Sequence, residues 1–381
     1  MGKSNLTKKT PWAHIPANYQ SESTRTVNGV NDFPPYKVFS SDEAEEQIKV
    51  IQSKRGYLNP ALAGADGKKP KRGKCTSILF FSDLHMVGTH LNKIKDFYRK
   101  HQKYIDNAIH LGDTMNAWNS GEFIWDLFPD AMNVIGNHDL YTQKDKTKFF
   151  AHKDNWLTPK ETYDMFLKKY IANWNVVQPK NAEELGKCYW HKDYNKHLRV
   201  IAIDCMRSDD LAQISWFKKT LADARKKNLQ VAVITHFNPL ADEFLDCNFT
   251  TIDYRDAEFM CRNGDGFNSK NFIDAIDEFM DNGGQFVSWI CGHKHKDAIM
   301  YARARHKQLI IIMEAATDFD LSSDSDHVWN TATGASWEII SIESLSNVIK
   351  IARFGNNFDH QMRHKGTFCY DFVNHKIITQ S

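Results

Sequence analysis

Five short apolar stretches of the chain each run directly into side chains that could bind a metal ion. A turn at the end of a strand needs Gly or Asn for its backbone conformation and gains nothing from His. Carboxylates, an amide and imidazoles form a mixed oxygen and nitrogen donor set, which suits manganese, iron, zinc or nickel better than calcium or magnesium. Thiolates, which are typical of structural zinc sites, do not belong to the set. In chain order the residues are Asp83, His85, Asp113, Asn137, His138, Asp139, His236, His293 and His295.

The spacing within two of these stretches favours joint binding. Asp83 and His85 are two residues apart, as are His293 and His295, and in an extended segment such residues point to the same side. Without His138 and Asp139 the set holds seven candidate ligands, which is too many for one ion. Two ions suit the number if a carboxylate bridges them, and such a pair can hold a bridging hydroxide for in-line attack on phosphorus. Asp113 is the natural bridge.

Strands that alternate with helices must position these groups. Between residues 75 and 297, apolar runs rich in Ile, Val and Phe alternate with amphipathic segments, which predicts a largely parallel sheet covered by helices. Ligands bind beyond the carboxyl ends of such strands, so we expect the candidate residues to converge in one site. The predicted strands are 78–81, 108–111, 132–135, 200–203, 231–234 and 286–290, and the predicted helices lie near 90–103, 158–174, 209–227 and 269–281, with Leu211, Ile214, Phe217 and Leu221 as a buried stripe.

The pattern changes after residue 297, where strand-like runs follow one another with few helical segments between them. This change predicts a second, more antiparallel sheet packed against the first. The fold class that we expect is therefore α/β, with two mixed sheets in a sandwich. The runs are 298–301, 309–313, 337–342, 348–352 and 368–373.

Residues 1–72 differ from the rest of the chain because they are polar and contain six of the ten prolines. We expect an N-terminal extension or docking segment here, with one helix from about Asp42 to Lys54, followed by a domain over residues 73–381. Five of the seven residues from Lys68 to Lys74 are basic. This basic cluster could contact a phosphate backbone or act as a localisation signal, and its simpler interpretation is a solvated linker.

Composition excludes several classes of protein. A formal net charge of +2 over 381 residues is not that of a general nucleic-acid binder. The seven cysteines contain no CxxC pair, so neither a disulfide framework nor a zinc ribbon is expected. The first thirty residues lack the apolar core of a signal peptide, and the roughly 18-residue apolar run of a membrane helix does not occur. We therefore expect a soluble, cytoplasmic protein without a membrane partner.

The order Asp-x-His, Gly-Asp, Gly-Asn-His-Asp, His, Gly-His-x-His resembles the calcineurin-like metallophosphoesterase superfamily. The motifs extend from Asp83 to His295, and five blocks in order, each after a predicted strand, are far more specific than any single motif. The resemblance implies a four-layer α/β/β/α sandwich that hydrolyses phosphate esters with two divalent metal ions. It implies that His138 is not a ligand but faces the phosphate, stabilises the transition state and helps to protonate the leaving oxygen. It assigns Asp83, His85 and His295 to one ion and Asn137, His236 and His293 to the other, with Asp113 shared.

The third residue after Asp113 distinguishes members of the superfamily. Protein Ser/Thr phosphatases resemble GDxxDRG at this point, purple acid phosphatases GDxxY, and double-strand-break nucleases GDxxH. Here the segment reads GDTMNAW, and Asn116 supplies neither the carboxylate nor the tyrosine, so the first two classes are disfavoured. We expect Asn116 and Asp139 to support the ligands or the substrate. Trp118 is a candidate for stacking on a nucleobase or sugar, and its alternative role is packing within its own segment.

The leading hypothesis is a metal-dependent phosphoric ester hydrolase. Diesters are slightly preferred to monoesters, because no phosphate-clamping arginine accompanies the motifs. Two alternatives stay open. The chain could be a binding or structural component of a larger assembly that docks through residues 1–72, or a nuclease that holds nucleic acid with Lys68–Lys74, for which the sequence gives no positive support.

Overall fold

The computed structural model describes most of the chain after residue 74. The described residues are 75–85, 88–114, 124–140, 156–247, 269–294, 298–313, 316, 335–355 and 367–378, and for a few of them only the backbone is described. The expected docking segment 1–72, with its helix and its basic cluster, therefore lies outside the described residues.

Two seven-stranded sheets form the body of the described fold. Sheet A contains β1 (Cys75–Phe81), β2 (Asn107–His110), β3 (Met132–Asn133), β11 (Ser336–Glu343), β12 (Val348–Gly355), β13 (Thr367–Asp371) and β14 (Lys376–Ile377). Sheet B contains β4 (Trp190–Asp193), β5 (Leu198–Ala202), β6 (Gln230–Ile234), β7 (Ala241–Cys247), β8 (Gln285–Cys291), β9 (Ala298–Ala302) and β10 (Leu309–Ile312). Their strand orders are β14-β13-β12-β11-β1-β2-β3 and β4-β5-β6-β8-β10-β9-β7.

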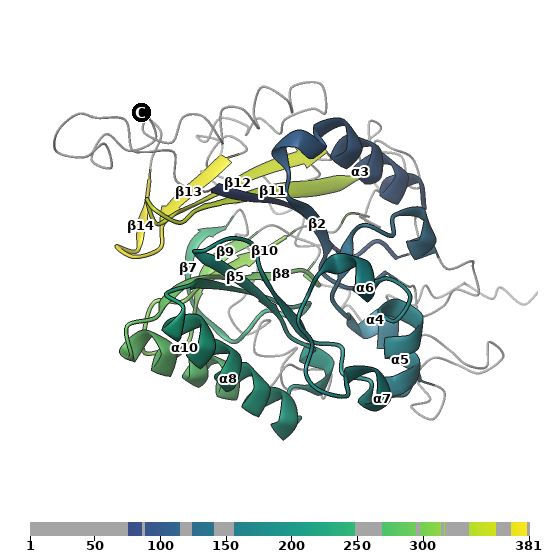
Figure 1. The fold of residues 1–381 in the computed structure, drawn as a ribbon. Coiled ribbons are helices and arrows are strands. Elements are labelled where there is room, and N and C mark those ends of the chain that lie inside the picture. The colour runs from purple at the N-terminus through teal and green to yellow at the C-terminus, as the bar shows by residue number, and fades with distance from the viewer. Residues whose placement is uncertain are drawn as a thin grey trace, which may run out of the picture.

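The sheets and helices form four layers. In Figure 1 the sheets lie one above the other, with α3 (Gly88–His101) on the outer face of sheet A and α8 (Leu211–Lys226) and α10 (Lys270–Asp281) on the outer face of sheet B. Both sheets are mixed: β1 pairs in parallel with β2 and antiparallel with β11. The predicted α/β sandwich of two mixed sheets flanked by helices is confirmed. No helix among the described residues is both long and apolar enough to cross a membrane.

The division of strands between the sheets differs from the expectation. Residues after 297 do not form a sheet of their own, because β9 and β10 join sheet B while β11 to β14 extend sheet A. The strands predicted to form one parallel sheet are instead split, with β1, β2 and β3 in sheet A and β5, β6 and β8 in sheet B. Six residues of β1 pair with six residues of β11, more than two hundred positions later in the chain. Local sequence patterns do not indicate a pairing between segments so far apart.

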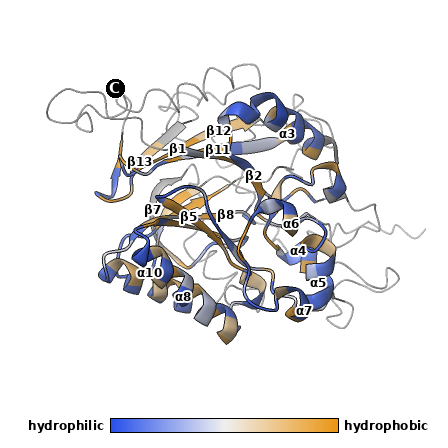
Figure 2. Ribbon diagram, in the orientation of Figure 1, coloured by the Kyte–Doolittle hydropathy of each residue, from blue (hydrophilic) through white to orange (hydrophobic). Residues whose placement is uncertain are grey.

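Burial on both faces explains the unbroken apolar runs. In β6, Ala232 and Ile234 belong to the core between the sheets, while Val231 and Val233 pack on the other face with α8 and α10. A strand covered on both sides needs no alternation of polar and apolar residues. Figure 2 shows this arrangement, with hydrophobic strands inside and hydrophilic helix surfaces outside.

Two helix predictions need correction. The predicted helix near 158–174 is divided into α5 (Pro159–Phe166) and α6 (Ile171–Trp174), because the backbone turns after α5, where Lys168 N–H donates to the carbonyl of Tyr163. In α8, Ile214, Phe217 and Leu221 are buried, but Leu211 is 78% exposed. Leu211 is the first residue after the N-cap Asp210, so the helix has not yet reached the sheet at that point.

Candidate metal centre

The candidate ligands converge at the carboxyl ends of strands from both sheets. Asp83 and His85 follow β1, Asp113 follows β2, and Asn137 begins the short helix α4 (Asn137–Leu140) after β3. His236 follows β6 and His293 follows β8 in the other sheet. The predicted convergence is thus present among the described candidates, and His295 lies outside the described residues.

Hydrogen bonds connect the strand ends of the two sheets. Nδ1–H of His236 donates to the carbonyl of Leu111 at 2.7 Å, and the backbone N–H of His293 donates to Oδ2 of Asp83 at 2.9 Å. Within sheet A, the backbone N–H of Asp83 donates to the carbonyl of Gly112 at 2.9 Å. These hydrogen bonds hold together loops that are far apart in the sequence.

The backbone of the site is strained at four of the candidate ligands. Asp83, His85, Asp113 and His293 have φ angles of 54°, 45°, 59° and 71°. This left-handed region is uncommon for residues other than glycine, and such residues cluster at functional sites where surrounding structure enforces them. The strained turns point the side chains of adjacent loops toward the same site.

Two glycines are required by close approach. A Cβ on Gly136 would lie 2.2 Å from Oδ1 of Asp113, and a Cβ on Gly292 would lie 1.8 Å from Oγ of Ser82. Real Cβ atoms do not approach other heavy atoms so closely. Glycine at these positions therefore allows the turns after β3 and β8 to pack directly on the turns after β2 and β1.

Asp113 lies at the centre of the site. Its Oδ2 atom is 3.2 Å from Nε2 of His236 and 4.0 Å from Nε2 of His138, and its Oδ1 atom accepts the backbone N–H of His138 at 2.8 Å. Two groups of possible metal ligands share it, each with its ligand atoms within 4.8 Å of one another. One group is His85, Asp113 and His138, and the other is Asp113, His236 and His293.

His236 directs its Nε2 atom toward the carboxylates. Because Nδ1 donates to a carbonyl, Nε2 is the atom that faces the site, where it lies 3.1 Å from Oδ1 of Asn137 and 4.0 Å from Oδ1 of Asp83. Burial alone would lower the pKa of His236, but the charge of Asp113 outweighs it and raises the pKa to about 9. Burial would raise the pKa of Asp113, but the neighbouring His236 and His138 hold it well below its usual value.

His293 offers a buried imidazole nitrogen. Its Nε2 atom is buried, and the part of the chain that the structure describes supplies no hydrogen-bond partner for it. Burial lowers the pKa of this imidazole well below its usual value, so the ring is neutral at pH 7, which is the form that binds metal ions. The ring packs against Phe237, at 4.1 Å between centroids, and His236, at 4.9 Å. An unsatisfied buried nitrogen beside two carboxylates fits a divalent cation.

His138, like His293, is half-buried, whereas the other described candidate residues are buried. Its side chain is 14% exposed, whereas those of Asp113, His236 and Asp83 are at most 1% exposed. Its ring lies edge-on to that of His85, with 4.7 Å between centroids. The exposed side is where a substrate would approach, although the geometry alone also places His138 among the possible ligands.

Asp139 accepts hydrogen bonds from the backbone of the turns that carry the candidate ligands. It is fully buried, and its Oδ2 atom accepts hydrogen bonds from the backbone N–H groups of Asp113 and Gly136, both at 3.0 Å. The other two residues expected to support the ligands or the substrate, Asn116 and Trp118, lie outside the described residues. Phe237 belongs to no motif and is marked in the sequence only by its place next to His236.

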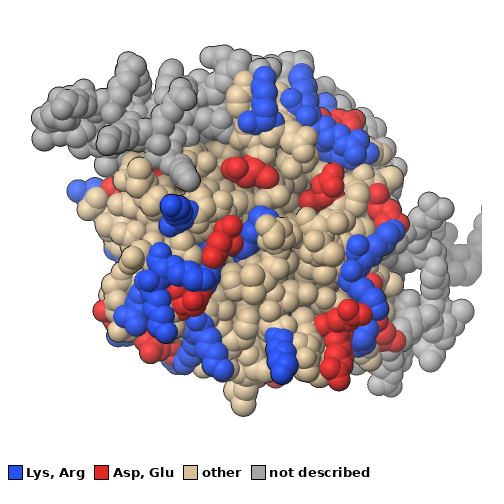
Figure 3. All heavy atoms as spheres, in the orientation of Figure 1, with Lys and Arg blue, Asp and Glu red and all other residues tan. Residues whose placement is uncertain are grey.

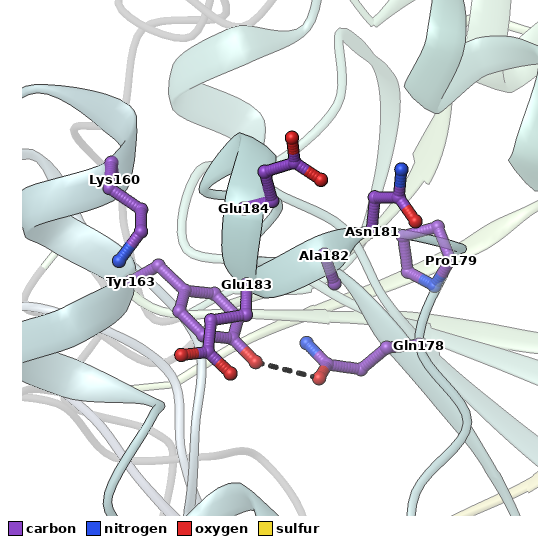
Figure 4. A pocket seen from close by; sticks show the side chains of 8 residues that line it. All are labelled: Lys160, Tyr163, Gln178, Pro179, Asn181, Ala182, Glu183 and Glu184. Carbon is purple, nitrogen blue, oxygen red and sulfur yellow. Dashed lines mark hydrogen bonds between the residues drawn. The ribbon is translucent and has the colours of Figure 1, made fainter.

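A surface hollow of about 500 Å³ lies away from these residues. Figure 4 shows that side chains of α5 and α7 (Ala182–Leu185) line it, with the hydroxyl of Tyr163 donating to Oε1 of Gln178 at 2.9 Å. Lys160 and Glu183, at its rim, form ion pairs with Asp164 and Lys168. The hollow contains none of the candidate ligands, so it is not part of the metal centre.

No family model and no curated protein matches the chain. Solved structures that it resembles include a dimetal phosphatase from Danio rerio, with a TM-score of 0.46 and 10% identity over 80% of this chain and 99% of that chain. PhoD has a TM-score of 0.46 and 10% identity over 82% of this chain and 73% of that chain. A metallophosphoesterase from Sphaerobacter thermophilus has a TM-score of 0.32 and 13% identity over 74% of this chain and 90% of that chain. The solved structures that resemble this chain thus include dimetal phosphatases and metallophosphoesterases.

Proposed function

We propose that the chain is a metal-dependent phosphoric ester hydrolase of the calcineurin-like metallophosphoesterase type. The observation that carries the proposal is the position of Asp113, whose carboxylate is common to two groups of possible metal ligands, one from sheet A alone and one from both sheets. A carboxylate shared by two ligand groups is what a pair of divalent ions needs. The order of the motifs from Asp83 to His293 supports the same proposal independently of the geometry.

The proposed ligands divide into two sets around Asp113. We assign Asp83, His85 and His295 to one ion and Asn137, His236 and His293 to the other. The donors are oxygen and imidazole nitrogen, which fits manganese, iron, zinc or nickel. Bound ions of this kind supply Lewis-acid activation of a phosphoryl group and of water.

His138 has the proposed catalytic role. Its accessible ring lies 4.0 Å from Oδ2 of Asp113, at the open side of the site, where the ring can donate a proton to the leaving oxygen and a hydrogen bond to the phosphoryl group. The backbone N–H of His138 is held by Oδ1 of Asp113, so the same carboxylate that the ions share also fixes the residue that acts on the substrate.

The preferred substrates are phosphodiesters. A phosphomonoester carries a second negative charge, which an arginine that binds the phosphate would neutralise. None of the five motifs contains an arginine. The test is turnover of an aryl phosphodiester and an aryl phosphomonoester by metal-free protein to which manganese, nickel or zinc is added. Metal-dependent turnover, faster with the diester, is expected. Absence of turnover with either ester and with nucleotides, under every metal, would contradict the hydrolase.

We place the hydrolase in residues 73–381 and treat residues 1–72 as a docking segment. Comparison of the solution mass of the full chain with that of a chain lacking residues 1–72 tests the docking role, and an unchanged assembly state would count against it. A nuclease would show affinity for nucleic acid that falls steeply with salt. On the face shown in Figure 3, basic and acidic side chains of the described residues lie interspersed rather than in one basic surface, which gives the nuclease no support.

A further inference from the structure

Strand β3 is a weak point in the support of the metal centre. It contains two residues and lies at the edge of sheet A, and it pairs with β2 only through Ile109 with Met132 and His110 with Asn133. One more backbone bond joins the strands, from Val134 N–H to the carbonyl of His110 at 3.0 Å. The turn that carries two of the proposed site residues follows directly, so other contacts must fix this strand.

Three buried side chains provide such contacts. Nδ1 of His110 lies 2.8 Å from Oδ1 of Asn133 and 3.3 Å from Oγ1 of Thr114, and Nδ2 of Asn133 donates to Oγ1 of Thr114 at 3.4 Å. All three residues are fully buried. An amide oxygen can only accept a hydrogen bond, so Nδ1–H of His110 is the donor to Oδ1 of Asn133. Burial lowers the pKa of His110 to about 4, so the ring is neutral at pH 7.

The three side chains join the elements that carry the site. Thr114 is the residue after Asp113, His110 is on β2, and Asn133 is on β3. The backbone carbonyl of Asn133 accepts the indole N–H of Trp190 from sheet B at 3.3 Å. Asn133 is therefore bonded to β2, to the turn after β2 and to the opposite sheet.

We infer that His110, Asn133 and Thr114 are positioning residues of the metal centre. Their side chains hold β3 against the turn that carries Asp113, and so set the distance between Asp113 and the ligand that follows β3. The inference rests on the proposed function, because it assumes that the centre holds a pair of ions. Hydrogen bonds behind metal ligands typically contribute 10- to 100-fold in metal affinity or activity.

The experiment compares Asn133→Ala with a matched control, Gln308→Ala. Gln308 is also a fully buried amide, bonded to Trp289, Ile273 and Asp277. It precedes β10, at the amino end of that strand, whereas the site lies at the carboxyl ends of the strands. Both variants lose a buried amide network and are expected to melt at a lower temperature than the wild type. Three quantities are measured on each protein: the Mn²⁺ affinity by calorimetry, the electron paramagnetic resonance signal of a coupled Mn²⁺ pair, and the melting temperature.

Asn133→Ala is expected to bind Mn²⁺ about 10- to 100-fold more weakly and to lose the signal of the coupled pair, whereas Gln308→Ala keeps wild-type affinity and signal. A second pair of variants tests the same inference if Asn133→Ala does not fold. His110→Gln keeps an N–H donor toward Asn133 and should retain the paired signal, and His110→Leu removes the donor and should lose it.

The inference would be overturned if Asn133→Ala and His110→Leu bound Mn²⁺ with wild-type affinity and kept the signal of the coupled pair. The three side chains would then stabilise the fold without positioning the metal centre. A wild-type protein that binds two ions but hydrolyses no ester contradicts the hydrolase alone, and the metal measurements then still decide the positioning role. A wild-type protein that binds no Mn²⁺ contradicts both.

Discussion

The carboxylate of Asp139 accepts a hydrogen bond from the backbone N–H of Asp113 at 3.0 Å. The same oxygen accepts the N–H of Gly136, also at 3.0 Å, so one buried carboxylate joins the turn after β2 to the turn after β3. The proposed ligands on these two turns follow different strands, and Asp139 is a direct connection between the turns.

Asp139→Ala should destabilise the protein strongly. The substitution leaves two buried N–H donors without their acceptor, at about 1–3 kcal/mol each, so the free energy of unfolding should fall by about 2–6 kcal/mol. Asp139→Asn retains an acceptor oxygen and should lose less. Urea unfolding of the three proteins checks this order, and equal stability of Asp139→Ala and the wild type would contradict the role of the carboxylate.

Asp113→Asn should release both ions, because the proposed bridge loses its charge. Metal content per chain, measured after dialysis of Mn²⁺-loaded protein, should fall from two ions toward zero. Asp164→Asn is the control, since Asp164 is exposed and forms ion pairs with Lys160 and Lys168, and it should keep both ions. Retention of two ions by Asp113→Asn would show that the carboxylate is not shared.

His138→Ala should separate catalysis from metal binding. We expect it to keep both ions and to lower turnover by the roughly 10²- to 10⁴-fold that is typical of lost acid–base catalysis. Metal content and turnover measured on the same preparation distinguish the outcomes. Loss of an ion would show that His138 is a ligand, as its distance to Asp113 also permits.

Gly292→Ala should disturb the contact between the turns after β8 and β1. Its Cβ would overlap the side chain of Ser82, and overpacking of this kind costs about 1–3 kcal/mol. Adding Ser82→Gly to Gly292→Ala removes the overlapping atoms and should restore part of the lost stability. Thermal unfolding of the two single variants and the double variant forms a cycle, and additive effects would mean that the two residues do not interact.

His191 should make the protein sensitive to acid. Burial lowers its pKa to about 4, with Arg199 as the next cause, whereas in the unfolded chain it titrates near 6.5. Between about pH 6.5 and 4 the unfolded chain therefore binds a proton that the folded protein does not, so the free energy of unfolding falls as the pH falls. His191→Gln should weaken this dependence in urea unfolding at several pH values, and parallel curves for variant and wild type would contradict it.

The convergence of the candidate ligands was predictable from the sequence because these residues follow strand ends. The apolar run at β6 and the one at β8 predict buried strands, and the carboxyl ends of such strands converge. The supporting contacts were not predictable to the same degree. The carbonyl of Leu111 that orients His236 and the ring of Phe237 beside His293 depend on how the sheets pack, which no local pattern encodes.

The fold was predictable in its class and less so in its pairing. Strands β4 and β7 were missed because they are edge strands with polar residues such as Lys192 and Asp242 among the apolar ones. The pairing of β1 with β11 joins segments more than two hundred residues apart, so the sequence could indicate a second sheet but not which strands would build it.

The most direct test of the proposed centre is the anomalous scattering of Mn²⁺ in crystals of the metal-loaded protein. The account predicts two peaks about 3.5–4 Å apart, with the carboxylate of Asp113 between them and His138 facing their open side. A single peak, or two peaks that do not share Asp113, would contradict it.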